Sequence, residues 1–115
     1  MEDGSYQRYA KTGELLLQSA ADAGCSRAAF VLAYDLFRRD RDREGRALMR
    51  KVADSTSDGL KAASFKALAI DAEWRLRDPG LALAYTKSAL DIPEISERLR
   101  TELEKRCSRL EEKRR

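Results

Sequence analysis

The side chains that most often carry catalysis are scarce in this sequence. It contains no histidine, which removes the commonest general base and the usual activator of serine or cysteine nucleophiles. The two cysteines, Cys25 and Cys107, lie far apart and do not have the spacing of a metal site. The glycines are isolated and form no phosphate-binding loop, and the acidic residues are diluted among Arg and Lys. We therefore expect no enzymatic activity, no metal and no cofactor.

The charge pattern argues for a mixed surface rather than a polycationic one. There are 23 basic and 20 acidic residues, which gives a net charge of +3. The densest run, residues 38–44, alternates in sign, and its interleaved acids weaken any field that could follow phosphates. We expect a solvated turn there and no nucleic-acid partner, although a contact with nucleic acid through this Arg-rich turn is the alternative. No segment has the length of a transmembrane helix and the N-terminus has no apolar signal region, so we expect a cytoplasmic protein without membrane contact.

The composition and the residues that typically begin or end helices predict an all-α protein of about six helices. Ala, Leu, Arg, Glu and Lys dominate, while proline occurs only twice. Gly24 suits a helix C-cap, and Pro79 and Pro93 suit first-turn positions. The expected N-caps are Ser26, Asp42, Asp58 and Asp78. The predicted helices are residues 5–23, 26–39, 42–54, 58–77, 79–91 and 93–112. Connections of a few residues predict antiparallel neighbours.

An internal repeat is the strongest pattern in the chain. The segments 15–22, 47–54 and 84–91 align without gaps, and each runs into a turn through Asp. Between them, a Leu-Ala-x-Asp core occurs at residues 32–35 and again 36 residues later at 68–71. Ala33 and Ala69 would let one helix approach its partner closely, and Gly45 and Ala82 would do so from the other side. Two kinds of helix thus alternate, although an ordinary six-helix bundle remains the other interpretation.

These residues resemble the tetratricopeptide superfamily, and its Sel-like branch in particular. The branch is similar in the run Ala-Ala-Asp-Ala-Gly at residues 20–24, followed by Ala28 and then by Leu32 and Ala33. The resemblance covers about residues 13–93. The sequence departs from the pattern where glycine is expected after each motif leucine, because both positions are alanine. The resemblance implies a short α-solenoid of antiparallel helix hairpins in which the first helix of each pair lines a concave face.

The expected layout is a single helical-repeat domain over residues 1–115. It comprises an N-terminal helix at 5–23, one hairpin at 26–54, a second hairpin at 58–91 and a C-terminal capping helix at 93–115. The chain would begin partway through a repeat and could belong to a longer array. In the last segment a narrow apolar stripe stands among charged residues, which fits either a cap or a helix that docks on a second copy. That stripe is Ile95, Leu99, Leu103, Cys107 and Leu110.

If the resemblance holds, two stripes of aromatic and charged residues face the concave side. Aromatic and arginine side chains dominate the binding energy of many protein interfaces. The first stripe is Arg27, Phe30, Tyr34, Phe37 and Arg38, and the second is Lys66, Ile70, Glu73, Trp74 and Arg77. The spacing of the aromatic residues in the first stripe is also typical of a buried face, so a core role stays open for them. Trp74 stands near a helix end between charged neighbours, where a partly exposed anchor is favoured.

The functional prediction is a protein–protein interaction scaffold or adaptor, or a chaperone-like module. Its partner would be a protein or peptide, held as an extended segment or a helix on the concave face. One alternative is a small nucleic-acid-associated regulator that uses the Arg-rich turn. The other is a homo-oligomeric structural protein, with a homodimer formed through the C-terminal helix.

Overall fold

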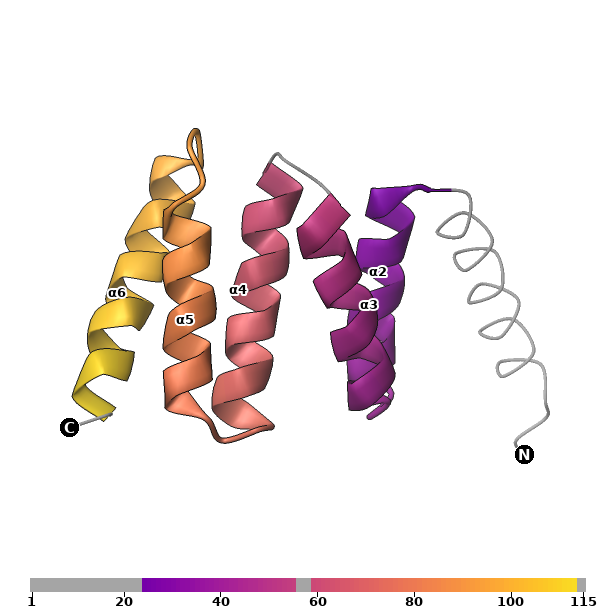
Figure 1. Cartoon of the computed structure of the whole chain (residues 1–115), viewed down its shortest axis with the longest axis horizontal. Coiled ribbons are helices and arrows are strands. Elements are labelled where there is room, and N and C mark those ends of the chain that lie inside the picture. The colour runs from indigo at the N-terminus through magenta and orange to yellow at the C-terminus, as the bar shows by residue number, and fades with distance from the viewer. Residues whose placement is uncertain (1–23, 56–58, 114–115) are drawn as a thin grey trace, which may run out of the picture. The chain divides into compact units, whose positions relative to one another are not determined.

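All secondary structure that the computed structural model describes is α-helical (Figure 1). The described residues are 24–55 and 59–113, so the expected helix at 5–23 and the expected cap Asp58 lie outside them. The helices are α2 (Ser26–Arg38), α3 (Asp42–Ser55), α4 (Gly59–Trp74), α5 (Pro79–Leu90) and α6 (Glu97–Lys113). The chain divides into two compact units, Met1–Leu48 and Met49–Arg115. None of the described helices is long and apolar enough to cross a membrane.

In the first unit, α2 and the start of α3 approach closely at a glycine. A Cβ atom on Gly45 would lie 3.0 Å from the carbonyl oxygen of Ala33 and 3.2 Å from the ring of Phe37. Leu32 and Ala33 are fully buried on the same face of α2, and Phe37 is buried as well. The expected role of Gly45 as a close-packing position is therefore confirmed, and Phe37 belongs to the core rather than to the surface.

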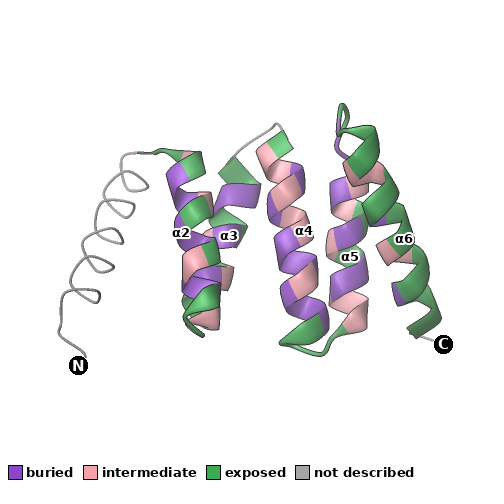
Figure 2. Ribbon diagram, turned by 180° about the vertical axis from the view of Figure 1, so that it is seen from behind, coloured by how far each residue is buried: buried purple, intermediate pink, exposed green. Residues whose placement is uncertain are grey.

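The second unit packs its helices in chain order, with α4 against α5 and α5 against α6. Its apolar residues form two clusters: one centres on Ala62, Ala89 and Leu103, and the other on Ala72, Ala82 and Leu110. Figure 2 shows buried residues along the length of α4 and α5, while most of α6 is exposed.

The apolar stripe of α6 is covered by its own chain. Leu103 and Leu110 are fully buried, and Ile95 is buried beside them. Leu99 and Cys107 pack against the two clusters of the second unit. Contact with the apolar residues of α4, α5 and the segment before α6 therefore covers the stripe.

The first turns of the helices agree with some of the expected capping residues and differ from others. Asp78 caps α5, because its carboxylate accepts the N–H of Leu81 at 3.0 Å, and Pro79 follows in the first turn as expected. The expectation that Pro93 begins the last helix is wrong. Glu94 has a left-handed backbone with φ of 67°, and the hydroxyl of Ser96 accepts the N–H of Leu99, so the helix starts at Glu97. The expected caps at residues 26 and 42 are each the first residue of a helix instead.

Two helices end on left-handed residues that are not glycine. After α2, Asp40 has φ of 61°, and Arg41 donates its N–H to the Leu36 carbonyl at 2.9 Å. After α4, Arg77 has φ of 53°, so the helix stops before the residue at which we expected its end. A left-handed backbone costs a residue with a Cβ roughly 1 kcal/mol relative to glycine.

We predict that Gly45→Ala lowers the free energy of unfolding by about 1 kcal/mol. Alanine favours helix by about 1 kcal/mol, but the new Cβ would overpack against a backbone oxygen and a buried ring, at a cost of roughly 1–3 kcal/mol. Gly59→Ala is the matched control, because nothing lies within 4 Å of its added Cβ and its stability should stay equal or rise. Urea unfolding followed by circular dichroism compares them, and equal gains in both variants would contradict the prediction.

We also predict that Arg77→Gly raises the free energy of unfolding by roughly 0.5–1 kcal/mol. Glycine removes the left-handed penalty, and its greater flexibility in the unfolded chain offsets part of the gain. Arg75→Gly is the comparison, because this exposed neighbour is not among the residues with positive φ and glycine there should give no gain. Thermal unfolding of both variants measures the difference, and loss of stability in Arg77→Gly would show that its side chain matters more than its backbone.

Candidate partner-binding surface

The first unit exposes a small aromatic patch on α2. Phe30 and Tyr34 are one helical turn apart, and their rings meet edge to face with centroids 5.0 Å apart. Tyr34 is 41% exposed and Val31 beside it is also exposed, whereas Phe30 is half-buried. This pair therefore presents one accessible aromatic side chain that is held in place by a second ring.

The second unit contains a buried carboxylate with three cationic partners. Glu73, on α4, is buried, and its side chain is almost inaccessible to solvent. Its Oε1 atom accepts hydrogen bonds from Arg106 at 2.9 Å and from Arg109 at 2.6 Å, and its Oε2 atom accepts one from Lys113 at 2.8 Å. The three cations stand on one face of α6, at positions three and seven residues apart. A buried charge needs such partners, so the cluster fastens α6 to α4 by electrostatics.

The ionisation of Glu73 follows from these contacts. Burial alone would raise the pKa of the carboxyl, because it disfavours the charged form. The hydrogen bond from Lys113 and the positive charges of Arg109, Lys113 and Arg106 outweigh burial and hold the pKa of Glu73 below its usual value. The carboxylate is therefore charged at neutral pH, and the cluster carries two more positive charges than negative ones.

The same cluster positions the most exposed aromatic residue described. Trp74 follows Glu73 at the end of α4 and is 60% exposed. The ammonium of Lys113 lies 4.7 Å from the centroid of its ring, within the range of a cation–π interaction. Lys113 therefore contacts both the buried carboxylate of Glu73 and the exposed indole of Trp74. Through Lys113, the position of the indole depends on the position of α6.

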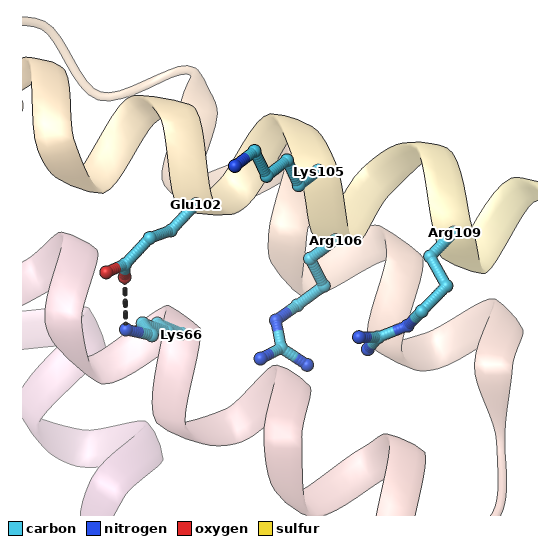
Figure 3. A pocket seen from close by; sticks show the side chains of 5 residues that line it. All are labelled: Lys66, Glu102, Lys105, Arg106 and Arg109. Carbon is cyan, nitrogen blue, oxygen red and sulfur yellow. Dashed lines mark hydrogen bonds and ion pairs between the residues drawn. The ribbon is translucent and has the colours of Figure 1, made fainter.

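Next to this cluster, α4 and α6 enclose an open groove of about 420 Å³. Four of its five lining residues are basic and one is acidic: Lys66, Lys105, Arg106, Arg109 and Glu102. Figure 3 shows Arg106 and Arg109 extending from α6 toward α4, and Lys66 pointing from α4 to Glu102. Lys66 and Glu102 form an ion pair of 2.6 Å, which keeps the pKa of Glu102 below its usual value, chiefly through the hydrogen bond from Lys66.

The structure distributes the residues of the two predicted stripes unevenly. In the first stripe Arg27, Tyr34 and Arg38 are exposed, Phe30 is half-buried and Phe37 is buried. In the second, Trp74 and Arg77 are exposed, Lys66 and Ile70 are half-buried and Glu73 is buried. Phe37 fills the core, which is the alternative that its spacing left open, whereas Glu73 corrects the expectation of an outward position because the cations of α6 enclose it.

The basic residues of α6 were missed as candidate site residues. The interpretations of the last helix as a cap or as a dimer contact depended on its apolar stripe alone. A second stripe was visible, because Lys105, Arg106, Arg109 and Lys113 recur at the spacing of one helical face. What the sequence did not show is that Glu73 lies opposite them.

The Arg-rich turn is paired within its own unit. Arg41 and Glu44 form two hydrogen bonds, of 3.0 and 2.6 Å, and Arg39 pairs with Asp35 at 3.0 Å. These contacts pair two arginines of this turn with carboxylates of the adjoining helices α2 and α3. Within the described residues, no group of three His, Cys, Asp or Glu is placed to hold a metal ion.

We predict that Glu73→Gln lowers the free energy of unfolding near pH 7 by about 2 kcal/mol, because three cations would then face an uncharged amide. The folded-state pKa of Glu73 lies below its unfolded value. The stabilisation that the charged Glu73 gives to the folded state is therefore complete above the unfolded pKa, and it is lost as the pH falls through the folded pKa. The difference between wild type and variant should shrink toward about pH 3.

Urea unfolding followed by the fluorescence of Trp74, the single tryptophan of the chain, measures this difference at both pH values. Glu104→Gln is the matched control, since Glu104 is an exposed carboxylate on α6, and it should change stability by less than about 0.5 kcal/mol. If Glu73→Gln lowers the free energy of unfolding by the same amount at both pH values, the charge of Glu73 does not have the role that we assign to it.

Comparison with known proteins assigns the chain to no family. No protein-family model, no curated protein and no solved structure matches it. Any proposal for its function therefore depends on the chemistry of the two surfaces described above.

Proposed function

We propose that this chain is a protein-interaction module of the tetratricopeptide-like, Sel-like kind that binds a segment of a partner protein. The observation that carries the proposal is Trp74, a large aromatic side chain that is 60% exposed yet held by Lys113. An exposed tryptophan with a fixed neighbour and surrounding arginines has the composition of an interface hot spot. Tyr34, which Phe30 supports from one side, is a second anchor of the same kind.

The repeat character is supported by contacts that recur 36 residues apart. The two motif aspartates, Asp35 and Asp71, each pair with an arginine one turn later, Arg39 and Arg75. The leucine and alanine of both motifs are buried. The two motifs thus share local contacts as well as sequence, which favours repeated hairpins over an unrelated bundle.

Two of the contacts between α4 and α6 join residues at the same interval, while Glu73 also bonds to Arg106 and Lys113 at intervals of 33 and 40 residues. Lys66 bonds to Glu102 and Glu73 bonds to Arg109, and in both pairs the partner is 36 residues later in the chain. The Leu-Ala-x-Asp motif itself does not recur in α6, where residues 104–107 are Glu-Lys-Arg-Cys. In a stacked repeat, α6 would be the first helix of a third pair, whose exposed face continues that of α4.

The two alternatives receive less support from the contacts. A homodimer through the last helix could not use the apolar stripe, because residues of α4 and α5 already cover it, and its interface would have to consist of charged side chains. A nucleic-acid contact through the Arg-rich turn would compete with the ion pairs that Arg39 and Arg41 make with Asp35 and Glu44. We therefore assign partner contacts to the exposed aromatic residue of each unit taken by itself, Tyr34 in the first and Trp74 in the second.

We predict that Tyr34→Ala and Trp74→Ala each remove bound proteins that the wild-type chain retains from native lysate. Hot-spot aromatics typically contribute about 2 kcal/mol or more, so retention should fall at least tenfold. Leu76→Ala is the matched control, because Leu76 is an exposed apolar residue just after α4 but outside both stripes. Quantitative mass spectrometry compares the bound proteins, and circular dichroism verifies the fold. The same retained proteins in all three variants would overturn the proposal.

A further inference from the structure

The groove between α4 and α6 contains more positive charge than its own carboxylates neutralise. Arg106 and Arg109 each give one nitrogen to Glu73, whereas a guanidinium carries five N–H donors. Arg109 and Lys113 are nearly half exposed, so their remaining donors are open to solvent. Lys105 lines the groove and is exposed as well. The groove is therefore suited to a ligand that carries negative charge.

The internal contacts indicate which anionic group the groove accepts. Both acidic side chains at the groove, Glu73 and Glu102, are carboxylates that basic residues of the opposite helix hold at 2.6–2.9 Å. The arginines thus already hold carboxylate oxygens in a charge-assisted geometry.

The length of the basic face indicates a ligand with several carboxylates. From Lys105 to Lys113 the helix rises about 12 Å, at 1.5 Å per residue. A single small anion would meet one or two of these cations, whereas an extended peptide of about four residues covers the same distance. Trp74 stands beside the last of them and can contact an apolar side chain of that peptide.

From these observations we infer that the α4–α6 groove binds an acidic segment of the partner protein through the basic residues of α6. This inference rests on the function proposed above and names the chemistry of the partner. Lys105, Arg106 and Arg109 contact the carboxylates of the segment, and Trp74 anchors its apolar end. Glu73 stays in place beneath them, because it is buried and keeps the two arginines oriented.

The test uses the full chain and a synthetic hexaglutamate peptide that ends in one leucine. Trp74 fluorescence and titration calorimetry measure binding at low and at physiological salt. A hexaglutamine peptide of the same form controls for charge. Lys105→Glu reverses a charge in the groove, and Lys87→Glu is its matched control, because Lys87 is exposed on α5 and does not line the groove. A single-stranded RNA oligonucleotide tests the competing ligand.

We expect the glutamate peptide to bind and the glutamine peptide not to bind, with affinity falling as salt rises. Lys105→Glu should weaken binding roughly tenfold, and Lys87→Glu should change it less than twofold. Equal effects of the two lysine variants would overturn the assignment to the groove. Absence of glutamate-peptide binding at low salt, or tighter binding of RNA that Lys105→Glu abolishes, would overturn the acidic segment as ligand.

These outcomes are separable from failure of the proposed function. If Trp74→Ala still removes lysate partners but the glutamate peptide does not bind, the inference about the groove fails alone. If neither aromatic variant changes partner capture, the proposed function fails, whatever the peptide does.

Discussion

The second unit depends on one constraint, the need of a buried carboxylate for compensating charge. Glu73 is enclosed between helices, where an unpaired negative charge would be costly, and all three of its cationic partners come from α6. The apolar stripe of α6 is narrow, with Leu103 and Leu110 as its only fully buried members. Apolar burial against α5 and charge pairing with α4 therefore fix this helix together, and they determine where its basic face lies.

The exposed anchor follows from the same constraint. Lys113 bonds to Glu73 and lies over the ring of Trp74, so one of the three residues that neutralise the buried charge also contacts the indole. An aromatic side chain that is already positioned loses less conformational freedom when a partner binds than a mobile one would. The ion cluster thus links stability to recognition, because loosening α6 would also loosen the anchor.

The sequence predicted the helices better than their ends. The predicted ranges begin where α2, α3 and α5 begin, although Ser26 and Asp42 are the first helical residues and not the caps that we expected. The last residue of α4 and the first residue of α6 differ from the predicted ones because Arg77 and Glu94 adopt left-handed backbones. Arginine and glutamate are not residue types that indicate such a backbone. The approach at Gly45 was predictable, since only a small residue permits it and the repeat indicated its position.

The candidate site was predictable only in part, because charge patterns on one helix do not reveal what faces them. The sequence predicts Glu73 on an outward-facing stripe, which is the usual position of a carboxylate. Its burial depends on α6, which provides the three cations that enclose it. The pairings at intervals of 33, 36 and 40 residues follow from that arrangement. Since Glu73 cannot leave its buried position without losing its partners, a ligand in the groove adds to the cluster rather than replacing it. Such a ligand must therefore use the outer donors of the arginines, which favours a flexible, multiply charged segment over a compact ion.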